Sequence, residues 1–96
     1  MYGTARYYAG PGAKELADLL EARKSDVEKL IRGVPGFVSY ALIRLTDGAA
    51  FSVTVCNDKA GCDESTRVAG EWIRSNAADL KPPAPMVSEG EVIVRM

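Results

Sequence analysis

The residues FVSYALIRLTDGAAFSVTVC, Phe37–Cys56, place two strand-like runs on either side of the dipeptide Asp47-Gly48. This dipeptide suits the positive φ angles of a two-residue type I′ turn, so the stretch predicts a β-hairpin. With these two residues as the loop, Leu42 would lie opposite Val53. A shift of one residue in this register would exchange the two faces of a strand, so the turn decides which side chains enter the core.

The two faces of this hairpin differ in the size of their side chains. We expect the face of Leu42 and Val53 to pack on the helices, because the larger apolar residues usually face the main core. The other face would then expose Phe37, Ile43 and Leu45. The reverse assignment would expose Tyr40, Leu42, Phe51 and Val53. Either face would be an unusual surface for a monomer, and a symmetric sheet-to-sheet homodimer would cover it.

The rest of the chain supplies two more strands and two helices. Alternation predicts a first strand over Tyr2–Ala9, and apolar residues at three- and four-residue spacing predict a helix over Ala13–Arg32. Asp58 is suited to cap a second helix that begins at Lys59, and Glu91–Met96 reads as the last strand. The predicted fold class is therefore α+β: a ferredoxin-like βαββαβ unit, with a four-stranded antiparallel sheet and both helices on one face. We expect one domain over residues 1–96.

Composition excludes several classes of function. The 96 residues carry a net charge of −1 and no run of like charge, which favours neither nucleic acid nor a membrane as partner. With no apolar run long enough to span a bilayer, the expected location is the cytoplasm. The absence of histidine excludes a histidine haem ligand, zinc sites that need histidine, and Ser-His or Cys-His nucleophile pairs. Cys56 and Cys62 are expected to be reduced thiols, the alternative being a disulfide that closes a very small loop.

The order of elements, together with several local motifs, resembles the dimeric α+β barrel superfamily over essentially the whole chain. The motifs are Val34-Pro35-Gly36-Phe37 before the second strand, Asp47-Gly48 at the hairpin, the run Phe51–Asp58 (FSVTVCND), Trp72 on the second helix, and Gly90-Glu91-Val92. These motifs are most similar to those of the antibiotic-biosynthesis-monooxygenase type. The resemblance implies a homodimer with a pocket between sheet and helices in each subunit. Members include cofactor-independent oxygenases of aromatic polyketides, haem-degrading enzymes, small isomerases and decarboxylases, and proteins of unknown role.

Two residues of the second helix are candidates for the wall of such a pocket. Trp72 either contacts an aromatic ligand or simply fills the core as the anchor of an amphipathic helix. Asn76, one turn later, needs hydrogen-bond partners if it is buried. Its amide either orients a ligand carbonyl or caps a backbone carbonyl near the end of the helix.

Strand residues supply the other candidates. Tyr8 and Tyr40 offer hydroxyls that either act as hydrogen-bond donors to a ligand or belong to side chains that only pack. Arg6 and Arg44 either bind a substrate carboxylate in a bidentate manner or reach solvent or an acidic neighbour. The predicted ligand-binding set is Trp72, Asn76, Tyr40 and Tyr8, with no catalytic residue assigned and no metal site.

Three functions remain open at this point. In the first, the chain is a cofactor-independent, monooxygenase-like enzyme that acts on a small aromatic metabolite, and this metabolite itself supplies electrons to oxygen. In the second, it is a ligand-binding or regulatory dimer without turnover. In the third, it is an accessory dimer whose pocket is filled by its own side chains. A cavity beside Trp72 would favour the first two, and a solid core the third.

Overall fold

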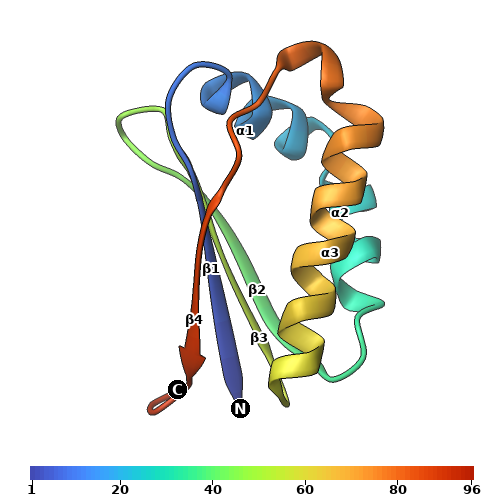
Figure 1. Ribbon diagram of the computed structural model, residues 1–96, viewed down its shortest axis with the longest axis vertical. Helices are drawn as coiled ribbons and strands as arrows, with labels where there is room; N and C mark the ends of the chain where they lie inside the picture. Colours follow the sequence, from blue (N-terminus) through green and yellow to red (C-terminus); the bar gives the residue numbers. More distant parts are fainter.

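A computed structural model describes residues 1–96 and shows one sheet with helices on a single side (Figure 1). Its four strands are antiparallel and lie in the order β2-β3-β1-β4, which confirms the ferredoxin-like α+β fold. The elements in chain order are β1 (Tyr2–Tyr8), α1 (Ala13–Ala22), α2 (Lys24–Arg32), β2 (Phe37–Arg44), β3 (Ala50–Cys56), α3 (Lys59–Asn76), the 3-10 turn η1 (Ala78–Leu80) and β4 (Met86–Glu91).

The hairpin between β2 and β3 has a loop of three residues, so the predicted two-residue turn is wrong. The amide of Leu45 donates to the carbonyl oxygen of Ala49 (2.8 Å), and the amide of Gly48 donates to that of Leu45 (3.0 Å). Gly48 has φ 91°, a left-handed conformation that favours glycine. Asp47 Oδ1 accepts a hydrogen bond from the amide of Ala49 (2.9 Å). The loop is the type I turn followed by a left-handed residue that is common in three-residue hairpins.

This extra loop residue moves the register by one. Leu42 lies opposite Ser52, and Val53 lies opposite Ala41 on the other face. Leu42 therefore faces the helices as predicted, whereas the expectation that Val53 does so is wrong. Phe37 also faces the helices, not the open side, because the register shifts between Phe37 and Ser39 at a β-bulge. The resulting open face carries Ala5, Tyr7, Ala41, Ile43, Phe51 and Val53.

The predicted single helix over Ala13–Arg32 is two helices with a break at Arg23, whose φ is −107° and ψ 28°. The apolar stripe explains the break. Leu16 and Leu20 are buried in α1, and the stripe resumes only at Val27 in α2. The intervening turn is charged and exposed, so no apolar side chain holds it against the sheet.

Helix α3 begins at Lys59 as predicted, and Asp58 Oδ1 accepts a hydrogen bond from the amide of Gly61 (3.0 Å). The last strand is Met86–Glu91, so the prediction of Glu91–Met96 is wrong. β4 pairs with β1 from Met86 opposite Tyr7 to Glu91 opposite Tyr2. Beyond this point β1 has ended, and the apolar run that follows has no strand beside it.

The main core lies between the sheet and the helices, around Leu16, Leu20, Val27, Ile31 and Tyr8. Cys56 and Cys62 are both buried, and no disulfide joins them. None of the helices is long and apolar enough to cross a membrane.

Candidate functional site

A small cavity of about 20 Å³ lies between the sheet and the helices. That is about the space one ordered water needs, roughly 10–15 Å³. The core beside Trp72 is therefore nearly filled by its own side chains, and a ligand has room only in the larger spaces that adjoin it. Its wall includes Arg6 and Tyr8 from β1, Tyr40 from β2, Ser52 from β3 and Trp72 from α3. The structure therefore brings three of the four predicted ligand-binding residues, Tyr8, Tyr40 and Trp72, to one place.

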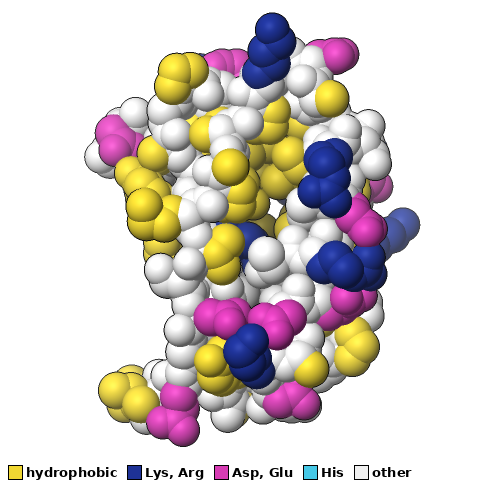
Figure 2. Space-filling view, in the orientation of Figure 1, with side chains coloured by type: hydrophobic (Ala, Val, Ile, Leu, Met, Phe, Trp, Pro, Cys, Tyr) yellow, Lys and Arg dark blue, Asp and Glu magenta, His cyan; other side chains and the backbone are white.

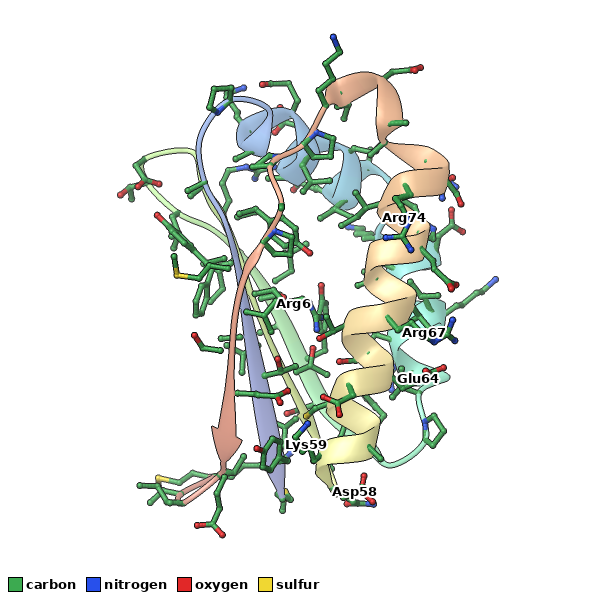
Figure 3. All side chains as sticks on the ribbon, in the orientation of Figure 1. Arg6, Asp58, Lys59, Glu64, Arg67 and Arg74 are labelled. Carbon is green, nitrogen blue, oxygen red and sulfur yellow. The ribbon has the colours of Figure 1, made fainter.

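A cleft of about 580 Å³ opens from this region to the surface, between β1, α3 and the proline-rich connector before β4. Arg6 and Tyr8 line both the cleft and the small cavity, so the two spaces share a wall. Thr66, Arg74 and the connector residues Pro82, Pro83 and Pro85 line the cleft toward solvent. In Figure 2 this face of the molecule is hollowed, and a basic side chain is visible inside; Figure 3 shows Arg6 there, between the strands and α3.

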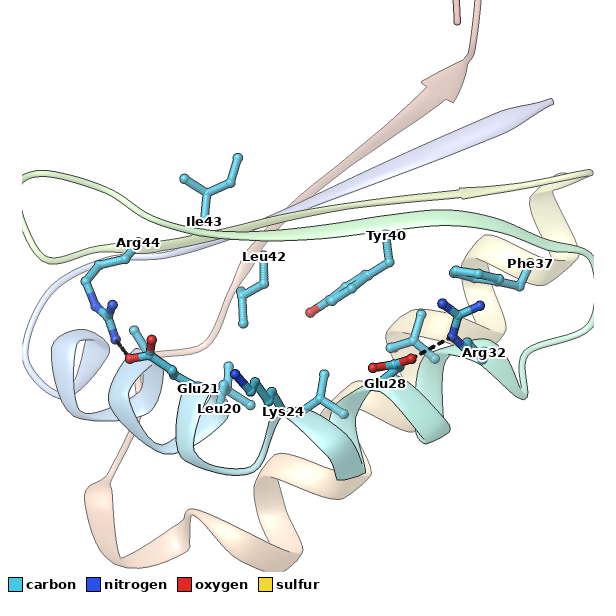
Figure 4. A pocket seen from close by; sticks show the side chains of 13 residues that line it. Leu20, Glu21, Lys24, Glu28, Arg32, Phe37, Tyr40, Leu42, Ile43 and Arg44 are labelled. Atoms are coloured by element: carbon cyan, nitrogen blue, oxygen red, sulfur yellow. Dashed lines mark hydrogen bonds and ion pairs between the residues drawn. The ribbon is translucent and has the colours of Figure 1, made fainter. Parts of the chain in front are cut away.

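A second groove, of about 440 Å³, lies on the opposite side of the small cavity, between the helices α1 and α2 and strand β2. Tyr40 points into it, and Leu42 and Phe37 form its floor (Figure 4). Its rim carries paired charges: Arg44 bonds Glu21 (2.9 Å), and Arg32 bonds Glu28 (3.1 Å). The groove thus has an apolar floor and a rim of mixed charge, in which Lys24 alone has no ion-pair partner.

Arg6 is the most unusual side chain of the site. It is 2% exposed, and its guanidinium donates to three hydroxyls: Nη1 to Ser65 Oγ (3.2 Å) and Thr66 Oγ1 (3.1 Å), and Nη2 to Thr54 Oγ1 (3.0 Å). No carboxylate pairs with it. A buried charge is normally neutralised by an opposite charge.

The two tyrosines at the cavity are held in their neutral form. Burial raises the pKa of Tyr8 and of Tyr40, and the nearby positive charge of Arg6 opposes this effect in both. At neutral pH both hydroxyls are therefore protonated and able to donate a hydrogen bond.

Trp72 and Asn76 have different positions. Trp72 is half-buried; it lines the small cavity, and the guanidinium of Arg23 lies 5.3 Å from the centre of its ring. Asn76 is exposed, lines none of the three spaces described above, and donates from Nδ2 to the carbonyl oxygen of Trp72 (2.9 Å). Its geometry is that of an amide that caps a helix-end carbonyl, and it lies outside the site.

The sequence makes Arg6 a candidate ligand of a substrate carboxylate, but Arg6 is not in the predicted ligand-binding set. Arg44 does reach acidic neighbours, Asp18 and Glu21, as one of the two interpretations had it. Arg6 reaches none. A signal was present: in the alternating strand Tyr2–Tyr8, Arg6 falls on the same face as Thr4 and Tyr8, and all three are buried.

In sequence, the chain matches no family model and no curated protein. In structure, it is similar to a monooxygenase from the ActVA-Orf6 gene of Streptomyces coelicolor in complex with nanaomycin D (TM-score 0.69, 19% identity, covering 99% of this chain and 89% of that one). It is also similar to the NE2512 protein of unknown function from Nitrosomonas europaea (TM-score 0.71, 16% identity, 99% and 90%). A dimeric ferredoxin-like protein from an uncultured marine organism matches with TM-score 0.66 and 14% identity, over 99% and 95% of the two chains.

These matches define the class of protein by its fold. The chain shares the ferredoxin-like α+β fold of these structures, as predicted from the sequence. At sequence identities below 20%, these structural similarities support the fold alone, so the activity has to be argued from the site.

Proposed function

We propose that this protein is a monooxygenase-like enzyme that binds a small aromatic metabolite between its sheet and its helices and oxygenates it without a bound cofactor. The observation that carries the proposal is the convergence of Tyr8, Tyr40 and Trp72 on a cavity that adjoins two spaces of several hundred Å³. Aromatic side chains around a concave space suit a flat ring. The similar Streptomyces coelicolor structure holds nanaomycin D.

The chemistry requires that the substrate reduce oxygen itself. With an anthrone as the test compound, each molecule oxidised to a quinone consumes one O₂. One oxygen atom enters the product, and the other leaves as water with the two hydrogens of the substrate carbon. Within the site, the neutral hydroxyls of Tyr8 and Tyr40 donate hydrogen bonds to substrate oxygens. Trp72 forms the inner wall, behind the residues shared with the cleft, and orients the substrate that enters from the cleft.

Oxygen uptake in the presence of a panel of anthrones and hydroxylated naphthalenes tests this proposal. We expect substrate-dependent uptake that falls at least tenfold in the Trp72→Ala variant, because the ring that orients the substrate is removed. Asn76→Ala is the matched control on the same helix, and we expect its rate to stay within twofold of the wild type.

The outcomes separate the enzyme from its alternatives. Saturable binding of a panel compound without oxygen uptake contradicts the enzyme and leaves the non-catalytic ligand-binding protein. Failure of every compound to bind, with the fold intact by circular dichroism, leaves the accessory role.

We also propose that the protein is a homodimer joined through the open face of its sheet. On this face the rings of Tyr7 and Phe51 meet edge to face at 6.4 Å, and Ile43 is 45% exposed. Such an apolar patch is suited to a second copy of the same surface. Structures described as dimeric ferredoxin-like proteins support this assembly.

A further inference from the structure

Arg6 is the only buried residue among the 12 lysines and arginines of the chain. The other eleven are exposed, and many pair with carboxylates on the helix surfaces, as Arg67 does with Glu64 and Glu71. Burial of a cation without a counter-ion costs on the order of several kcal/mol, even after the surrounding protein has relaxed. Packing alone does not account for a charge at this position, because an apolar side chain of similar length would fill the same space.

The polar atoms around Arg6 leave its charge uncompensated. Its three hydrogen bonds all go to hydroxyls, which are neutral, and these bonds occupy three of the five donors of a guanidinium. Ser52 lies directly opposite Arg6 in the neighbouring strand, lines the same cavity and is 2% exposed. Its Oγ forms no hydrogen bond of good geometry, and its polar neighbour is the hydroxyl of Tyr40, whose pKa it lowers slightly against the larger effect of burial. Arg6 therefore lacks a counter-charge and Ser52 lacks a well-formed hydrogen bond, and both side chains line the same cavity.

The charged side chains that line the cleft leading to Arg6 are all basic. Its lining includes Arg6 on the inside and Arg74 on α3, and it includes no acidic residue. Ile73 and the proline side chains of the connector give the same cleft an apolar wall. The groove on the other side of the cavity differs, because glutamates line its rim: Arg44 pairs with Glu21 and Arg32 with Glu28, and Lys24 is the one basic residue of that rim without an ion pair.

From these observations we infer that the ligand of this pocket is a small aromatic anion, which enters by the cleft beside α3 and pairs its carboxylate or ionised phenol oxygen with the guanidinium of Arg6. The inference rests on the proposed aromatic pocket and adds the charge of the ligand. The two remaining donors of Arg6 bind the anionic oxygens, and the hydroxyl of Ser52 gains a well-formed hydrogen bond. The ring lies against Tyr8 and Ile73 in the direction of solvent.

The test is a pair of probes that differ only in charge: 2-naphthoate and 2-naphthamide. Isothermal titration calorimetry of the wild-type protein is expected to give at least tenfold tighter binding of the naphthoate. In Arg6→Met, which keeps the length of the side chain but removes the charge, the naphthoate is expected to lose at least tenfold while the naphthamide stays within about threefold. Arg67→Met is the matched control, because Arg67 is exposed on the same helix as Arg74 and lines none of the three spaces.

The thermal unfolding of Arg6→Met separates a binding role from a structural one. If Arg6 is present for a ligand, the variant is expected to melt at the same temperature as the ligand-free wild type or above it, since removal of an uncompensated buried charge is neutral or stabilising. A melting temperature lowered by more than about 10 °C would overturn the inference and assign Arg6 to the fold.

The wild-type comparison decides the question even if Arg6→Met fails to fold. Equal affinity for the two probes overturns the anionic ligand while the aromatic pocket stands. A preference for the naphthoate that persists in Arg6→Met also overturns it. Failure of both probes to bind overturns the pocket itself, and with it the proposed function.

Discussion

The thiol of Cys62 is held in its protonated form by its surroundings. Its Sγ donates to the carbonyl oxygen of Tyr2 (3.3 Å), and burial raises its pKa from 9.0 to about 11. A folded-state pKa above the unfolded value means that the thiol contributes its full stability below pH 9. This contribution is lost as the pH rises through about 11. The free energy of unfolding, measured with urea, is therefore expected to fall between these pH values.

The variant Cys62→Ala separates this effect from those of Cys56, Tyr8 and Tyr40, whose raised pKa values act in the same direction at high pH. We expect the fall in unfolding free energy with pH to be less steep in the variant, by at most about 1.4 kcal/mol per pH unit. Parallel curves for the two proteins would contradict the assignment. The comparison concerns slopes only, because truncation of a buried side chain lowers the stability at every pH.

The sequence allowed us to predict those residues of the candidate site whose apolar or aromatic character indicates that they are buried. Trp72, Tyr8 and Tyr40 are aromatic, and the alternating or helical pattern places them inside. Arg6 gives no such signal by type. Its hydrogen-bond partners Thr54, Ser65 and Thr66 lie 48 to 60 positions away in the sequence. The hydrogen bonds of Arg6 therefore cannot be predicted from residue spacing within one element, because they form only when α3 packs on β1 and β3.

At the scale of the element, the two glycines of α3 have different roles. A Cβ at Gly61 would lie 2.6 Å from the carbonyl oxygen of Pro35 and 2.9 Å from Cys56 Cβ, so the helix approaches the chain at this point too closely for any side chain. A Cβ at Gly70 would meet only the flexible end of Arg74, at 3.4 Å. Only the first glycine is required by the fold.

Alanine at these two positions is therefore expected to have opposite effects. Gly70→Ala should raise the free energy of unfolding by about 0.5–1 kcal/mol through helix propensity. Gly61→Ala should lower it by about 1–3 kcal/mol, because of the overpacking against Pro35. Urea unfolding of the two variants beside the wild type checks both signs. Stabilisation by Gly61→Ala would contradict the close contact.

The errors at this scale have a common cause. Periodicity locates an apolar run, but its pairing depends on neighbours that the run does not contain. Glu91–Met96 alternates like a strand, yet β1 has no residues left to pair with it. In the hairpin, the amide of Leu45 donates to the carbonyl oxygen of Ala49, which leaves a loop of three residues. The dipeptide Asp47-Gly48 is compatible with a loop of two or of three residues, so it does not determine the loop length. The order and type of the strands were predictable, since each strand is bounded by its own turn residues.

At the scale of the whole molecule, the helices leave one side of the sheet uncovered (Figure 1). Val53 lies in the middle of this open face, with Ala5 and Ala41 beside it on the neighbouring strands. Small side chains at these two positions allow another surface to approach closely. The exposed apolar residues Ile93 and Val94 follow β4 beyond the end of β1. The one-residue change in register is what places Val53 here, so the corrected hairpin defines the proposed dimer surface.

A carboxylate at position 53 is therefore expected to separate the proposed dimer. Light scattering coupled to size exclusion, at tens of micromolar chain, should give twice 10.3 kDa for the wild type and 10.3 kDa for Val53→Glu, because two charges would meet across the symmetric interface without partners. Ala22→Glu adds the same charge to an exposed position of α1 and should remain dimeric. A monomeric wild type, or a Val53→Glu protein that stays dimeric, would contradict association through the open face. If the ligand pocket lies wholly within one chain, a folded Val53→Glu monomer should still bind the naphthoate probe, since Arg6 and the cleft lie on the opposite side of the sheet.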